Sequence, residues 1–151
     1  MGKNLKGKNP LLDSNVFIGR TVPASDLERM YLSSVVLYEL MAANIDDSMM
    51  SIYASWRKSF SDSKRLLTPS ATDWFECSKL VRNLLRGVKS KTAGTVAKVT
   101  SAQQQQNDAL IARTATTHNC FVVTGNVRDF EKFQPYMNGL VVVPADYFFD
   151  S

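Results

Sequence analysis

Short apolar runs alternate with amphipathic helical patterns along nearly the whole chain. These runs occur at Leu11–Leu12, Leu32–Val36, Phe121–Val123 and Leu140–Val143, and each has the length of a buried strand. Strands that are buried on both faces and separated by helices form parallel sheets. The sequence therefore predicts an α/β domain whose parallel sheet is covered by helices on both faces.

The size and charge of the chain limit its function classes. Its 151 residues suit one domain, and we interpret the polar, basic residues 1–9 as a flexible lead-in and residues 10–151 as that domain. No run approaches the ~18 apolar residues of a membrane helix, and the polar N-terminus is not a secretory signal. We expect a cytoplasmic protein in which Cys77 and Cys120 are small, reduced, buried side chains. The net charge of +4 favours a polyanionic partner.

Helical periodicity is expected between the strands. Residues 48–66 carry Met and aromatic side chains at helical spacing, which indicates a core face or a dimer interface. Ser70 and Asp73 resemble a capping box, so a helix should begin there and run to about Leu85, before Gly87 breaks it. We interpret Gln103–Gln106 as a solvated helix start. The other expected helices cover residues 16–20, 36–43 and 108–118, the last with Asn107 as its cap.

Four carboxylates lie at the ends or beginnings of these elements. Asp13 follows the first apolar run, Glu39 lies in the helix after the second, Asp108 opens the helix before the third, and Asp129 lies in the loop after it. Ligands of parallel sheets bind beyond the carboxyl ends of the strands. We therefore expect the four to converge around Mg²⁺ or Mn²⁺, which prefer oxygen ligands. Taken singly, each acid also fits an ordinary cap, turn or surface position.

The segments that carry these acids resemble the PIN-domain nucleases, and especially the VapC toxins of VapBC toxin–antitoxin pairs. The matching segments are LLDSNVFI, SSVVLYELMA, NDALIA and VVTGNVRDF, in the same order and spacing from Leu11 to about Val143. The resemblance implies a parallel sheet of about five strands with helices on both sides. It also implies an acidic Mg²⁺ or Mn²⁺ centre and metal-dependent endoribonuclease activity.

The resemblance assigns roles to individual residues. Asp13, Glu39 and Asp108 match the three most invariant acids of the family and Asp129 matches a fourth, more variable one, so these four are the implied catalytic and metal-binding residues. The implied reaction is hydrolysis of an RNA phosphodiester bond by water that one or two metal ions activate. The polar positions that would support the acids are Ser14, Asn15, Thr124 and Asn126.

Basic side chains near the acids are candidate RNA contacts. Arg82 and Arg86 lie on one predicted helix, Lys89 follows them, and Arg128 precedes Asp129. Each of these cations also fits an ordinary solvated face. The resemblance implies an RNA substrate, with tRNA as one candidate class, a cognate antitoxin and a homodimer. Two alternatives stay open, namely a PIN nuclease of RNA processing or decay, and a catalytically silent PIN module that only binds.

Overall fold

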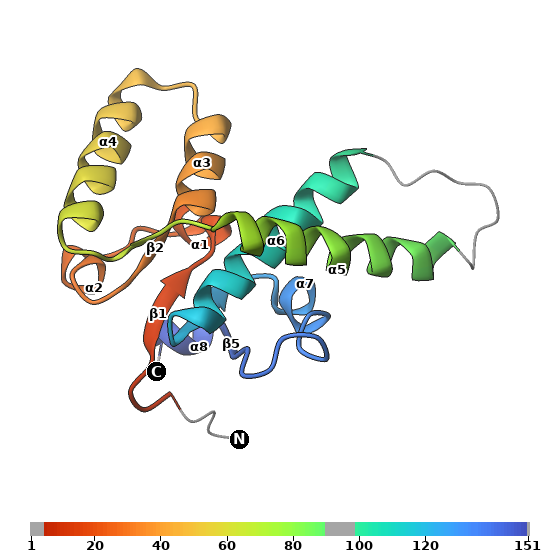
Figure 1. Ribbon diagram of the computed structural model, residues 1–151. Helices are drawn as coiled ribbons and strands as arrows, with labels where there is room; N and C mark the ends of the chain where they lie inside the picture. Colours follow the sequence, from red (N-terminus) through yellow and green to blue (C-terminus); the bar gives the residue numbers. More distant parts are fainter. Residues whose placement is uncertain (1–4, 90–98, 151) are drawn as a thin grey trace.

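The computed structural model describes residues 5–89 and 99–150, with the side chains of residues 87–89 and 99–100 left out of the description. Helices dominate this part of the chain, and short strands lie between them (Figure 1). In chain order the elements are β1 (Asn9–Leu12), α1 (Ser14–Gly19), α2 (Ala24–Leu27), β2 (Leu32–Ser33), α3 (Ser34–Ala43), α4 (Asp47–Asp62), β3 (Leu66–Leu67), α5 (Ala71–Lys89), α6 (Val99–Thr117), β4 (Cys120–Thr124), α7 (Val127–Glu131), β5 (Val142–Pro144) and α8 (Ala145–Asp150).

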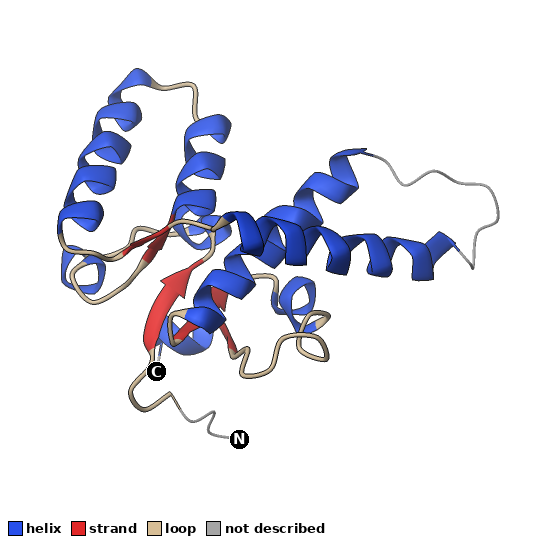
Figure 2. Ribbon diagram, in the orientation of Figure 1, coloured by secondary structure: helices blue, strands red, loops and turns tan. Residues whose placement is uncertain are grey.

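All the described strands pair in parallel. β1, β4 and β5 form a three-stranded sheet in the order β1-β4-β5, and β2 pairs with β3. In the larger sheet Leu11 pairs with Val122, which pairs in turn with Val142. A parallel bridge between Leu11 and Tyr31 joins β1 to the segment that enters β2. Figure 2 shows these strands at the centre of the molecule with helices around them, and the predicted α/β fold is confirmed.

The three-stranded sheet forms the middle of the hydrophobic core. Every residue of β4 is buried, as expected for a strand that is covered on both faces. In Figure 1, α6 passes in front of this sheet and α8 lies behind it. The aromatic rings of Phe121 on β4 and Phe148 on α8 have centroids 6.0 Å apart. The site described below lies where β1 and β4 end, between α3 and α6.

The Met and aromatic side chains at helical spacing within residues 48–66, here called the aromatic stripe, mostly face the core. Tyr53 and Phe60 are buried, and the ring of Trp56 packs against Phe17 with centroids 5.4 Å apart. Ile52 is the member of the stripe that stays exposed. The stripe therefore belongs mainly to the core, and the predicted homodimer gains no support from it.

The strand predicted over residues 32–36 is wrong beyond Ser33. The Ser33 hydroxyl accepts from the Val35 amide at 3.1 Å and caps α3, so the helix begins directly after β2. The helix predicted to end at residue 66 ends at Asp62. Leu66 and Leu67 instead form β3, which pairs with β2.

Three further boundaries differ from the prediction. α5 continues through Gly87 to Lys89, because one helical glycine costs only about 1 kcal/mol. α6 begins at Val99, so the glutamines lie inside it and Asn107 is no cap. The predicted loop around Asp129 contains α7. The proposed lead-in is described only from residue 5 onward, and Asn9 already belongs to β1.

Candidate active site

Asp13 lies at the carboxyl end of β1 and caps α1. The Asp13 amide continues the sheet ladder and donates to the Val123 carbonyl oxygen at 2.9 Å. Its side-chain Oδ1 accepts from the Ser14 amide at 2.8 Å, which makes Asp13 the N-cap of α1. The residue is only 6% exposed. Strand and helix together therefore fix the direction of this carboxylate.

Polar groups from the end of β4 hold the second oxygen of Asp13. Thr124 Oγ1 donates to Asp13 Oδ2 at 3.0 Å, and both groups are buried. The same hydroxyl oxygen accepts from the Asn15 side-chain amide at 3.3 Å and from the Asn126 backbone amide at 3.0 Å. Asn15 and Asn126 thus reach Asp13 through one hydroxyl group, and Asn126 does so with its backbone rather than its side chain.

Glu39 and Asp108 come from two helices that pack against each other, α3 and α6. Glu39 Oε1 accepts from Ser14 Oγ at 3.4 Å, and the nearby Asn107 side chain opposes the rise in the pKa of Glu39. Asp108 lies midway along α6 and is 4% exposed. Its Oδ1 accepts from Gln104 Nε2, one turn earlier on the same helix, at 3.3 Å.

Burial and neighbouring carboxylates raise the pKa values of Asp13, Glu39 and Asp108. Burial is the main cause of the raised pKa of Asp13, the charge of Asp129 adds to it, and the hydrogen bonds to Asp13 oppose it. Burial and then the charge of Asp13 raise the pKa of Glu39. For Asp108, burial followed by the charges of Asp13 and Glu39 raises the pKa from 3.8 to about 7. Such effects require nearby charges, so the four predicted acids lie in the same region of the molecule.

Asp129 reaches this cluster from α7, in whose first turn it lies exposed. Its negative charge raises the pKa of both Asp13 and Asp108. Lys132, which directly follows α7, acts in the opposite sense because its positive charge favours ionised Asp108. The cluster therefore contains one cation that the sequence analysis did not assign. Its signal was the three-residue spacing from Asp129, which puts both side chains on the same face of a helical turn.

Gln104 and Asn107 were also missed. Both precede Asp108 on α6, where Gln104 contacts Asp108 and Asn107 contacts Glu39. With the helix predicted to begin at Asp108, Gln104 and Asn107 lie outside it and their contacts cannot be inferred. A helix that begins earlier puts residues four apart, such as Gln104 and Asp108, on the same face. The error in the start of α6 therefore concealed two polar neighbours of the acids.

The chemistry of this cluster fits a hard divalent cation. Its donors are carboxylate oxygens, and their shared charge is unfavourable without a cation or a proton. Within residues 5–89 and 99–150, no three His, Cys, Asp or Glu side chains lie close enough together to hold a metal ion. The side chains are therefore near one another but are not drawn into a coordination sphere. A cation would remove the repulsion that opposes a tighter arrangement.

The candidate RNA-binding cations lie in different parts of the surface. Arg82 and Arg86 are exposed on α5, and Arg128 is exposed on α7, beside Asp129. In the described part of the chain none of the three forms an ion pair. The side chain of Lys89 lies outside the described residues. Arg128 is thus the predicted cation that the helix α7 brings to the acids.

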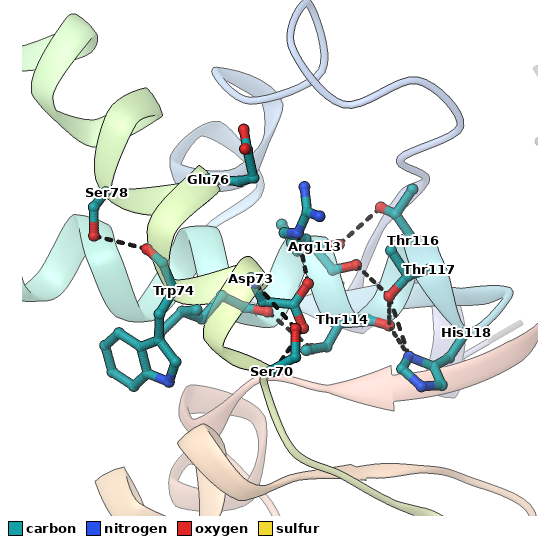
Figure 3. Close-up of polar contacts among 12 residues, drawn as sticks. Ser70, Asp73, Trp74, Glu76, Ser78, Arg113, Thr114, Thr116, Thr117 and His118 are labelled. Atoms are coloured by element: carbon teal, nitrogen blue, oxygen red, sulfur yellow. Dashed lines mark hydrogen bonds and ion pairs between the residues drawn. The ribbon is translucent and has the colours of Figure 1, made fainter.

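Asp73 and Arg113 fix α5 against α6 behind this site. The predicted capping box is confirmed, because the Ser70 amide donates to Asp73 Oδ2 at 2.8 Å and the Asp73 amide donates to Ser70 Oγ at 3.1 Å. Arg113 Nε donates to Asp73 Oδ1 at 2.6 Å (Figure 3). Burial alone would raise the pKa of Asp73, but these bonds outweigh it and lower that pKa.

At the level of sequence, no protein-family model and no curated protein matches the chain. Solved structures do match it. A chain of the DNA-bound VapBC structure from Salmonella typhimurium is 19% identical, with a TM-score of 0.51 over 91% of this chain and 98% of that one. A chain of VapBC2 from Rickettsia felis, bound to a promoter DNA fragment, is 20% identical, with a TM-score of 0.49 over 89% and 97% of the two chains. The molecule therefore shares the fold of a component of the Salmonella VapBC complex, and the predicted PIN-type fold is confirmed.

Proposed function

We propose that this chain is an Mg²⁺- or Mn²⁺-dependent endoribonuclease that acts as the toxin of a toxin–antitoxin pair. The observation that supports it most is that Asp13, Glu39, Asp108 and Asp129 lie near enough for their charges to influence the pKa values of Asp13, Glu39 and Asp108. Two of them, Asp13 and Asp108, are buried. Buried carboxylates with raised pKa values reduce the stability of a fold, so their presence favours a functional role.

Each residue of such a site would have a separate role. Asp13 and Asp108 would hold a divalent cation directly, and Glu39 and Asp129 would hold it through water. The cation supplies water activation and stabilises negative charge at the phosphate. Thr124 and the Ser14 amide keep each oxygen of Asp13 in a fixed direction, at 3.0 and 2.8 Å. 

Arg128 and Lys132 are the cations nearest to this chemistry. Arg128 is exposed on α7, where it can meet the RNA backbone. Lys132 already acts on Asp108 electrostatically, and a phosphate brought to the acids would be attracted by it. Arg82, Arg86 and Lys89 extend the proposed RNA path along α5.

The toxin assignment rests on the sequence resemblance and on the fold shared with a component of VapBC. It implies a small antitoxin as partner, a homodimer, and action in the cytoplasm on RNA such as tRNA. Among the helices that the structure describes, none has the length and apolar character needed to cross a bilayer. The alternatives are a nuclease of RNA processing or decay and a module that binds RNA without cutting it.

Cleavage of a total RNA pool by the purified protein tests this function. The proposal predicts cutting in Mg²⁺ or Mn²⁺, none in EDTA, and loss of cutting in Asp13→Asn. Asp150→Asn serves as the matched control, because Asp150 is an exposed carboxylate at the end of α8. Metal-independent cutting, or undiminished cutting by Asp13→Asn, would contradict the proposed site. Metal-dependent RNA binding without cutting would favour the silent module.

A further inference from the structure

An open pocket of about 500 Å³ is lined in part by α3 and α6, the two helices that carry Glu39 and Asp108, and the proposed chemistry does not use it. This volume lies within the range of roughly 300–1,000 Å³ that is typical of small-ligand sites. Its walls come from α3, from the segment that leads into α5, from the start of α5, and from α6. The lining residues that matter below are Tyr38, Pro69, Trp74, Gln103, Gln106 and Asn107.

Two residues that line the pocket are sequence neighbours of the carboxylates. Tyr38 precedes Glu39 on α3, and Asn107 precedes Asp108 on α6. Asn107 lines the pocket from α6 and lies near Glu39 on the adjoining helix α3. A ligand in the pocket is therefore next to any phosphate that the acidic cluster engages.

Two aromatic side chains that line this pocket are exposed to solvent. Tyr38 is 64% exposed and Trp74 is 47% exposed. The backbone of Trp74 is nonetheless firmly held, because its carbonyl oxygen accepts from Gln106 Nε2 at 3.3 Å and from Ser78 Oγ at 2.7 Å. Figure 3 shows the Trp74 ring pointing away from the Asp73 and Arg113 side chains. The fold thus presents two solvent-exposed aromatic side chains in the pocket, one of them on a firmly held backbone.

The polar groups of the pocket suit a flat, uncharged heterocycle. Gln103, Gln106 and Asn107 carry amide groups, which both donate and accept hydrogen bonds. An anionic ligand would be repelled by the neighbouring carboxylates, whereas a neutral ring is not. Aromatic faces together with amide groups are the means by which proteins bind unpaired RNA bases.

We propose that this pocket binds one base of single-stranded RNA, which stacks on Tyr38 and Trp74 while the adjoining phosphodiester lies at the acidic cluster. The inference rests on the proposed nuclease function and adds a base subsite to it. The amide groups of Gln103 and Asn107 make this subsite the place where base identity is read. RNA preference would then come from this pocket, while the exposed cations contribute attraction that is independent of sequence.

The test measures the binding of a short, fluorescently labelled single-stranded RNA by anisotropy, in Mg²⁺. The Asp13→Asn background prevents cutting. Tyr38→Ala and Trp74→Ala are compared with Tyr147→Ala, which removes an equally exposed aromatic side chain from α8, outside the pocket. Circular dichroism checks the fold of each variant. A second set of RNAs carries an abasic nucleotide at successive positions.

The inference predicts a loss of affinity of about 5- to 150-fold for Tyr38→Ala and for Trp74→Ala, which corresponds to ~1–3 kcal/mol of base stacking. Tyr147→Ala should bind like the parent. One abasic position should weaken the parent by a similar factor but should leave Trp74→Ala unchanged, because the same contact is already lost. Unchanged affinity in both pocket variants, with a parent that binds RNA, overturns the base subsite and leaves the nuclease proposal standing. A parent that does not bind RNA, together with a wild-type protein that does not cut it, overturns both.

Discussion

Replacement of Asp108 by Asn should stabilise the protein at neutral and alkaline pH in the absence of divalent metal. The side chain is almost fully buried, and its pKa is raised from 3.8 to about 7 by burial and by the charges of Asp13 and Glu39. Asn removes the charge with little change of shape and keeps an oxygen that can accept from Gln104. The substitution therefore relieves an electrostatic penalty and leaves the local packing in place.

The pKa of Asp108 sets the size and pH dependence of this effect. A rise of about three units in the pKa of Asp108 corresponds to ~4 kcal/mol of unfolding free energy, since each pKa unit is worth about 1.4 kcal/mol. The folded pKa lies above the unfolded value, so the native state binds the extra proton and the unfolding free energy falls as pH rises from 3.8 to about 7. Asp108→Asn should gain up to ~4 kcal/mol over the wild type at pH above 7, and the gain should vanish near pH 4.

Urea denaturation in EDTA, followed by circular dichroism across this pH range, measures the gain. Asp150→Asn, an exposed carboxylate control, should change the unfolding free energy by less than about 0.5 kcal/mol. Mg²⁺ should stabilise the wild type more than Asp108→Asn, because only a ligand that binds the folded state adds stability. The reasoning is refuted if Asp108→Asn is no more stable than the wild type in EDTA at high pH, or if wild-type stability does not fall between pH 5 and pH 7.

Three further predictions follow from the contacts around the site. Thr124→Val keeps the side-chain shape but removes the hydroxyl that donates to Asp13, so denaturation should show a loss of about 1–3 kcal/mol, and an unchanged unfolding free energy would contradict the role of this bond. Asp73→Asn loses the charge that Arg113 and Ser70 stabilise. Because the native pKa of Asp73 is lowered, the wild type should be more stable than the variant above the unfolded pKa of Asp73, and this advantage should disappear as pH falls through the native pKa. A stability difference that does not depend on pH would contradict the role of the Asp73 charge. Arg128→Ala should weaken RNA binding for all sequences and reduce the slope of log affinity against log salt by about 1, whereas an unchanged slope would place Arg128 away from the RNA.

The sequence alone was sufficient to predict β1 and β4, the two strands whose ends lie near the acids. Leu11–Leu12 of β1 and Phe121–Val123 of β4 are apolar and buried, and such runs are readable without any structure. Asp13 directly follows the first run, and Thr124 ends the second. The position of these polar side chains at one edge of the sheet follows from the parallel arrangement alone.

The parts that could not be predicted depend on contacts between distant segments. β2 and β3 are two-residue strands, too short for a period of two to appear, and they exist because they pair with each other. α6 begins at Val99 and soon runs into four glutamines, where helix propensity is good but no apolar face indicates a helix. Its early start gives Asp108 the neighbours Gln104 and Asn107, so a local error in one boundary altered the expected environment of the site.

The most direct test of the account is a crystal structure with Mn²⁺, in which anomalous scattering locates the ion without assumptions about the site. The account predicts an anomalous peak bounded by Asp13 and Asp108, within reach of Glu39 and Asp129, and the loss of that peak in Asp13→Asn. A protein that takes up no Mn²⁺ at these carboxylates, or binds it only elsewhere, would contradict the metal centre on which the proposed nuclease depends.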